Sequence, residues 1–151
     1  MSAFEVVIWK FIRQDLLAAE FEQWVYTHPE LEEFFGKDFY LEVISAGFIE
    51  EAHTFKLRES LLEWMELHTK PSCECIKWKS YFVLGEVILG FRDGECFLAS
   101  SFETLKVQDD KRKLIACLGC KQKWYLGIDE IYVDHHLLRL SGAQIKSIED
   151  G

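Results

Sequence analysis

FEQWVYTHPELEEFFGKDFYLEVIS, from Phe21 to Ser45, is the stretch that decides the fold of the N-terminal half. Its first part belongs to an apolar stripe with the spacing of one helix face, made of Leu17, Phe21, Trp24, Val25 and His28. A break follows at 27–30, where either Thr27 caps the next helix or His28 does so with Pro29 in the first helical position. The second arrangement is favoured, because a residue before proline avoids the helical region.

The remainder of this stretch predicts two more short helices. The first has an apolar face of Leu31, Phe34 and Phe35, and Gly36 follows at the position where helices commonly end in a left-handed residue. The second restarts the helical period with Tyr40, Leu41, Ile44 and Phe48. The acidic residues outside these apolar faces are expected to crowd one surface region: Glu30, Glu32, Glu33, Asp38 and Glu42.

Similar patterns on either side complete a helical half over residues 1–71. A stripe from Phe4 to Leu16 predicts the first helix, and a stripe from Leu57 to His68 predicts the last, with Thr54 as its cap. Pro71 ends that helix, because proline cannot continue it. The tryptophans on these stripes are expected in the core: Trp9, Trp24 and Trp64.

From about residue 74 the pattern becomes strand-like. Short runs suited to strands occupy 76–79, 81–84, 87–89, 96–99, 114–117, 124–126 and 128–133, and a last strand or two falls within 137–148. Turn signals separate the runs at 92–95, at 108–111 and at Ser141-Gly142, and Gly127 predicts an irregularity. Such spacing is typical of an antiparallel meander.

The predicted fold class is therefore α+β. We expect one compact domain over 1–151, in which four to five short helices of residues 1–71 pack on an antiparallel β-meander of residues 74–148.

The charge of the chain is unevenly distributed. Residues 1–75 carry 15 acidic against 6 basic residues, a net charge of −9, whereas residues 76–151 carry 11 of each. The whole excess of negative charge thus lies on the helical half. This balance argues against binding to nucleic acid or to an anionic membrane.

The N-terminus and the cysteines favour a cytoplasmic location. Residues 1–5 lack a basic region of the signal-peptide kind, and no apolar run approaches the roughly 18–20 residues of a membrane span. The count of five cysteines is odd, which predicts reduced thiols.

Four of those cysteines form two close pairs. Cys73 and Cys75, together with Cys117 and Cys120, provide enough thiolates for a zinc site, and the second pair has a hairpin-like setting. Against zinc, the first pair has one intervening residue where structural zinc sites prefer two to four. The pattern favours ordinary buried thiols without settling the question, and we assign no metal ligand and no cofactor.

The sequence also lacks a recognisable catalytic set. The favoured interpretation of Asp134-His135-His136 is a surface turn. On a strand the two histidines would point to opposite faces and could not bind one ion together, and in a turn the set would still lack a third ligand. We assign no catalytic residue and expect a protein that is not an enzyme.

Residues 16–48 resemble a kind of small bacterial protein with the pattern F-E-x-W-V-Y, E-L-E, G and Y-L-E-(L/V)-I-S. The matching segments are 21–26, 30–32, Gly36 and 40–45. Proteins with this region are often immunity-like partners of polymorphic bacterial toxins. The resemblance implies a cytoplasmic inhibitor that neutralises a toxin by covering it.

Three functions follow. The favoured one is an immunity-type inhibitor that recognises a protein partner, such as a basic toxin domain, through Glu30, Glu32, Glu33, Asp38 and Glu42, with Tyr26 and Tyr40 as aromatic anchors. The second is a small enzyme or ligand-binding domain with a pocket between helices and sheet, lined by His28, His53, His68, Tyr26 and the cysteines. The third is a self-associating assembly module.

Overall fold

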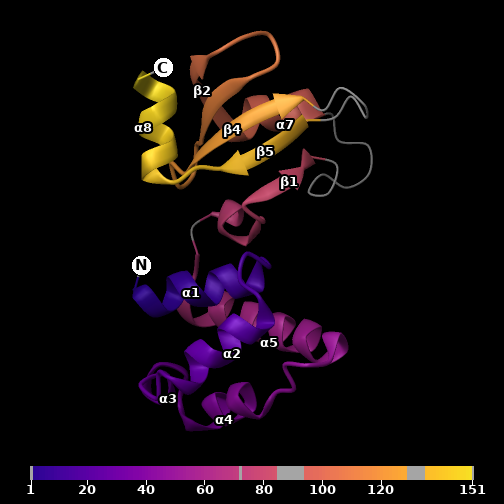
Figure 1. The fold of residues 1–151 in the computed structure, drawn as a ribbon, viewed down its shortest axis with the longest axis vertical. Helices are drawn as coiled ribbons and strands as arrows, with labels where there is room; N and C mark the ends of the chain where they lie inside the picture. The colour runs from indigo at the N-terminus through magenta and orange to yellow at the C-terminus, as the bar shows by residue number, and fades with distance from the viewer. Residues whose placement is uncertain (1, 72, 85–93, 129–134, 151) are drawn as a thin grey trace. The chain divides into compact units, whose positions relative to one another are not determined.

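Helices occupy the first half of the chain and an antiparallel sheet with flanking helices occupies the second, so the predicted α+β class is confirmed (Figure 1). The computed structural model describes residues 2–71, 73–84, 94–128 and 135–150. The chain divides into two compact units, Met1–Pro71 and Ser72–Gly151.

The helical unit contains α1 (Ala3–Ile12), α2 (Ala18–Tyr26), α3 (Leu31–Phe35), α4 (Lys37–Ser45) and α5 (Glu51–Thr69). Helix α1 begins with a capping box, in which Ser2 and Glu5 each bond the other's backbone N–H. Rings fill the core between the helices. Phe11 and Phe21, both fully buried, stack with centroids 4.0 Å apart.

Some predicted details of this unit are wrong. Helix α3 begins at Leu31 because Pro29 and Glu30 first form a turn, in which the Leu31 N–H donates to the His28 carbonyl at 3.1 Å. Thr27 instead closes α2 by donating its hydroxyl to the Gln23 carbonyl at 2.9 Å. Gly36 does adopt a positive φ, +85°, but its ψ of 153° is extended, so it joins α3 directly to α4.

Burial along the last two helices also differs from the prediction. Val43 is buried in α4, whereas Leu41 is 47% exposed, so the buried face of α4 is rotated from the predicted one. Thr54 does not cap α5. The helix begins at Glu51, and the buried Thr54 hydroxyl donates to the Glu50 carbonyl at 2.8 Å. Trp9 is buried as predicted, while Trp24 and Trp64 are half-buried.

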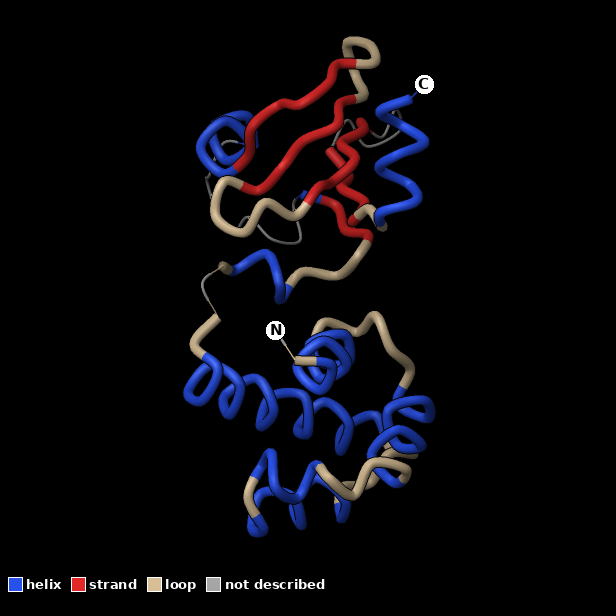
Figure 2. The backbone as a smooth tube through the Cα atoms, turned by 90° about the vertical axis from the view of Figure 1, so that its left-hand side faces the viewer, coloured by secondary structure: helices blue, strands red, loops and turns tan. Residues whose placement is uncertain are grey.

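The second unit is built on a five-stranded antiparallel sheet (Figure 2). Its strands are β1 (Tyr81–Val83), β2 (Phe102–Val107), β3 (Lys113–Cys117), β4 (Lys123–Ile128) and β5 (His135–Arg139), in the order β1-β5-β4-β3-β2. Strands β2 to β5 form an antiparallel meander of the predicted kind, although β2 occupies residues for which no strand was predicted. Strand β1 joins the meander at the edge beside β5. The remaining elements are the 3₁₀ turn η1 (Glu74–Lys77) and the helices α7 (Gly94–Ser101) and α8 (Gly142–Asp150).

Three predicted strands are replaced wholly or in part by helical structure: the first half of 76–79 by η1, 96–99 by α7, and 142–148 by α8. The last has a local cause that the turn prediction missed. Ser141 and Gln144 form a capping box, since each side chain bonds the other's backbone N–H. The predicted strand at 87–89, residues 92 and 93 of the predicted turn, and residues 129–133 lie outside the described residues. The other half of that turn, Gly94 and Glu95, begins α7 instead.

Gly127 does not mark an irregularity. Strand β4 keeps an unbroken register with β5, in which Gly127 lies opposite His136. A Cβ atom at this position would lie 2.3 Å from Nε2 of His136, so the absence of a side chain makes room for that ring.

The core of the second unit includes two thiols among its apolar side chains. Its buried members are Cys75, Phe82, Leu84, Phe102, Ile115, Cys117, Trp124, Leu126 and Leu137. The sheet and the turn η1 therefore share one core, and the turn is held where Cys75 and the preceding Cys73 meet Cys117 at the end of β3.

Candidate metal centre

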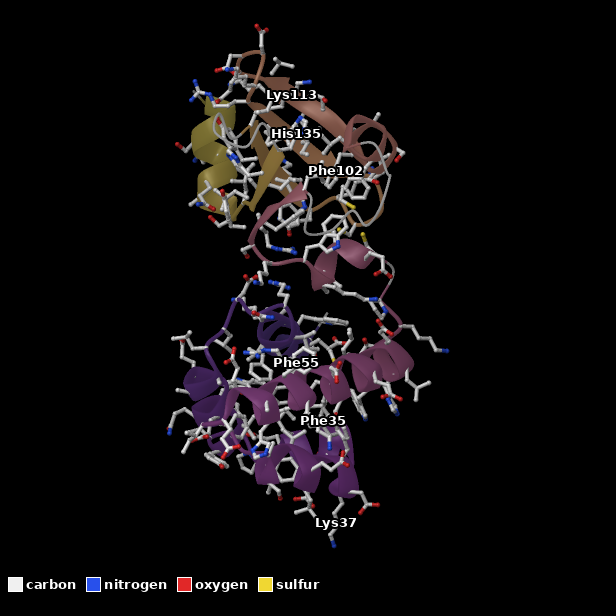
Figure 3. The ribbon with its side chains drawn as sticks, turned by 90° about the vertical axis from the view of Figure 1, so that its right-hand side faces the viewer. Phe35, Lys37, Phe55, Phe102, Lys113 and His135 are labelled. Carbon is white, nitrogen blue, oxygen red and sulfur yellow. The ribbon has the colours of Figure 1, made fainter. Side chains whose placement is uncertain are left out.

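Four cysteine sulfur atoms meet at one place in the second unit. The Sγ atoms of Cys73, Cys75, Cys117 and Cys120 all lie within 4.8 Å of one another. The closest approaches join the two segments: 3.3 Å between Cys73 and Cys117, and 2.9 Å between Cys75 and Cys120. Figure 3 shows sulfur atoms in yellow close to the labelled Phe102, which belongs to the same core.

The first pair reaches the centre through the turn η1. Cys73 is extended, with φ −146° and ψ 140°, and the chain then coils into the 3₁₀ turn that contains Cys75. The backbone N–H of Cys75 donates to the Cys73 sulfur at 3.4 Å. One intervening residue is sufficient here, because the change from extended to coiled backbone directs both sulfurs to the same side.

The second pair reaches the centre from the hairpin between β3 and β4. Cys117 is the last residue of β3, and its backbone N–H donates to the Gln122 carbonyl at 2.9 Å. Gly119 lies between the two cysteines, where an added Cβ would be 3.2 Å from the sulfur of Cys73. The missing side chain thus lets the hairpin backbone approach the opposite pair.

The surroundings of the thiols are unequal. Burial raises the pKa of Cys73 and, more strongly, that of Cys75, which is 1% exposed. Burial also acts to raise the pKa of Cys117, yet hydrogen bonds from the backbone of Cys120 and Gly119 and from Cys73 outweigh it and leave that pKa below its ordinary value. Backbone N–H groups are therefore already directed at a sulfur that would carry negative charge.

The size of the cluster fits a single ion. A zinc–sulfur bond of about 2.3 Å in a tetrahedron places neighbouring sulfurs about 3.8 Å apart. The observed separations, from 2.9 Å to within 4.8 Å, bracket that value. Four thiolates in a tetrahedral arrangement suit zinc and leave no position open for a substrate, which is the pattern of a structural site.

The adjacent histidines take no part in this centre. The favoured interpretation of these residues, a surface turn, is wrong: both lie on β5, where His135 is opposite Ile128 and His136 is opposite Gly127. Neighbouring residues of a strand face opposite sides of the sheet, so the two rings do not share one ion. Within the described residues, the cluster of side chains close enough to hold an ion consists of the four cysteines.

The residues predicted to bind a partner lie on the helical unit. All five acids are exposed: Glu30, Glu32 and Glu33 at the start of α3, and Asp38 and Glu42 on α4. Asp38 and Glu42 are four residues apart and share one face of α4. Tyr26 is 54% exposed, whereas Tyr40 is half-buried.

The histidines proposed to line a pocket have local roles. A ring nitrogen of His28, just after the end of α2, lies 2.7 Å from the carbonyl of Trp24, four residues earlier. A ring nitrogen of His68, within α5, lies 2.9 Å from the carbonyl of Trp64, also four residues earlier. His53 pairs with Glu50 at 3.6 Å. His53 also lines a cavity inside the helical unit, together with Phe39 and Leu57.

No protein-family model, curated protein or solved structure matches this chain. None of the helices in the described ranges combines the length and the apolar character that crossing a bilayer requires. What the fold and the site define is an α+β chain with a helical unit and a sheet unit that gathers four thiols.

Proposed function

We propose that the second unit binds one zinc ion through Cys73, Cys75, Cys117 and Cys120, and that this ion is structural. The observation that carries the proposal is the meeting of the four sulfur atoms within 4.8 Å. Two of the thiols are buried in the sheet core and two lie nearer the surface, so the ion would be anchored inside and loaded from outside.

The ion would join two segments that are distant in sequence. Cys73 and Cys117 are 44 positions apart, and Cys75 and Cys120 are 45 apart. A ligand set of this kind does not exist in the unfolded chain, so the free energy of metal binding contributes to folding. Zinc here would stabilise the unit in the way that a cross-link does.

The metal content of the purified full chain tests this proposal. We expect about one equivalent of zinc per chain by mass spectrometry, and a tetrahedral tetrathiolate absorption spectrum after exchange with Co²⁺. Cys75→Ser should abolish both signals. The fifth cysteine supplies a matched control, because Cys96→Ser should leave both unchanged. A wild-type chain without bound metal, or one whose Cys75→Ser variant binds as well, would overturn the proposal.

We further propose that the protein is a non-enzymatic inhibitor, and that its helical unit docks a basic protein partner. The support is the uneven charge together with the exposure of all five acids on α3 and α4. Complementary charge accelerates association and selects partners. In view of the resemblance at 16–48, an immunity-type inhibitor of a bacterial toxin is the form of this function that we favour.

Capture with the full chain as bait tests the docking proposal. We expect a basic protein to be retained by the wild type and lost by a variant with Glu32, Asp38 and Glu42 changed to Lys. Glu103→Lys, at an exposed position on β2, is the matched control and should retain it. A partner retained equally by the triple variant would exclude this surface.

A further inference from the structure

The side chain of Arg139 connects the two segments that carry the cysteines. Arg139 is the last residue of β5 and is not itself a metal-binding type. Its Nη2 donates to the Cys75 carbonyl at 2.6 Å and to the Trp78 carbonyl at 3.1 Å. These carbonyls lie within and just after the turn η1, so the guanidinium holds the segment of the first cysteine pair at two points.

The same guanidinium also contacts the hairpin of the second pair. Nη1 of Arg139 donates to Oε1 of Gln122 at 3.2 Å. Gln122 follows the hairpin, and its carbonyl accepts the backbone N–H of Cys117 at 2.9 Å. One planar group therefore sets the position of both ligand-bearing segments.

The position of the guanidinium is itself constrained. Its Cζ atom lies 4.5 Å from the centre of the Trp124 ring, which is fully buried. This stacking fixes the plane of the guanidinium group and thereby the directions in which its N–H groups point. Lysine has neither the planar fork nor several donors in fixed directions.

The charge of Arg139 has the sign that the centre requires. Four thiolates around a divalent ion leave a doubly negative group, and a partly buried charge of this kind is unfavourable without a nearby compensating charge. Arg139 provides a permanent positive charge that is bonded to the carbonyl of Cys75, itself one of the four cysteines.

We propose that Arg139 is the positioning residue of the metal centre: it holds η1 and the β3–β4 hairpin at the separation that four sulfurs need around one ion, and it offsets the charge of the loaded site. This inference rests on the proposed zinc site. Loss of such an outer contact typically lowers metal affinity by roughly 10- to 100-fold.

Competition with a chromophoric chelator, using Zn²⁺ and the full chain, measures this effect. We expect Arg139→Met to bind Zn²⁺ roughly 10- to 100-fold more weakly, and Arg139→Lys to recover only part of the loss because it restores the charge without the fork. Arg112→Met removes a 60% exposed arginine of the same unit, bonded to Asp109, and should leave the affinity unchanged.

A purely structural role is separated by a double-mutant cycle. If Arg139 acts through the centre, Arg139→Met lowers the melting temperature of the metal-loaded wild type but has little effect in the Cys75→Ser background. An equal effect in both backgrounds would overturn the inference. Should Arg139→Met fail to fold, the same melting temperatures are compared for Arg139→Lys in the wild-type and Cys75→Ser backgrounds.

The outcomes also separate this inference from the proposed function. A wild-type chain that binds no Zn²⁺ overturns both. A wild-type chain that binds Zn²⁺ with an affinity unchanged by either substitution of Arg139 overturns this inference alone.

Discussion

The sulfur of Cys75 lies 2.9 Å from the sulfur of Cys120, although 45 positions separate the two residues in the chain. Cys75 is buried in the core of the sheet unit, whereas Cys120 is exposed on a hairpin. The pair thus links the interior of the unit to its surface, and the effects of a bound ion should extend through the core.

Removal of the metal should loosen the sheet unit selectively. After treatment of the full chain with a strong zinc chelator, we expect faster amide hydrogen exchange at 73–84 and at 113–128, because η1 and the β3–β4 hairpin lose their link. Exchange in the helices of residues 2–71, which contribute no ligand, should stay the same. Exchange that accelerates equally in both units, or in neither, would contradict a local structural role.

Gly119→Ala should weaken metal binding. The new Cβ would lie 3.2 Å from the sulfur of Cys73, and a sulfur bound to an ion cannot rotate away as a free thiol can. Crowding of this kind costs about 1–3 kcal/mol, or roughly a 5- to 150-fold loss of affinity.

Gly142→Ala is the matched control for this substitution. A Cβ at Gly142 meets no atom within 4 Å, so the affinity for Zn²⁺ should not change. If titration finds the same affinity for Gly119→Ala as for this control, the close approach of the hairpin to Cys73 is not needed for binding.

The helical unit should depend on the stacked rings of Phe11 and Phe21. Phe21→Ala empties a fully buried site and should lower the free energy of unfolding of this unit by about 3–5 kcal/mol, measured by denaturant titration. Phe55→Ala removes the same side chain from a position that is 60% exposed, where a loss below about 0.5 kcal/mol is expected. Similar losses for the two variants would argue against this core.

Binding of a basic partner should be fast and sensitive to salt. Once a partner is in hand, changing Glu32, Asp38 and Glu42 to Lys should reduce its association rate by at least about tenfold at low ionic strength, with a smaller change in dissociation. The reduction should shrink as salt is added, since exposed charges are screened. If neither the substitutions nor added salt changed the association rate, these acids would not accelerate the encounter with the partner.

Local patterns predicted most of the fold, and they failed where a local signal was ambiguous. The helical period located α1, α2 and α5, and short apolar runs between turn signals located β3 and β4. The alternation at 76–79 was misleading, because no strand forms there. The short apolar run at 96–99 suits a strand or a helix equally, and here it belongs to α7. The box of Ser141 and Gln144 was readable in the sequence, but the neighbouring Ser-Gly pair suggested a turn instead.

The centre illustrates a different limit. All four cysteines were visible as two pairs, yet nothing in the sequence states that η1 and the β3–β4 hairpin meet across 44 positions. The single residue between Cys73 and Cys75 argued against zinc only if both cysteines had the same backbone conformation. In the structure Cys73 is extended and Cys75 lies in a 3₁₀ turn. Arg139 carried no signal, because its role arises from long-range contacts with Cys75 and Trp78.

The order of the ligands along the chain has a consequence for biosynthesis. Cys75 leaves the ribosome 45 residues ahead of Cys120, which at about 5–20 residues per second is an interval of roughly 2–9 s. During that time the nascent chain presents two thiols without the two that complete the set. Newly made chains therefore pass through a brief period in which stray metal or oxidant competes for the first pair, and the translation of residues 76–120 sets how long it lasts.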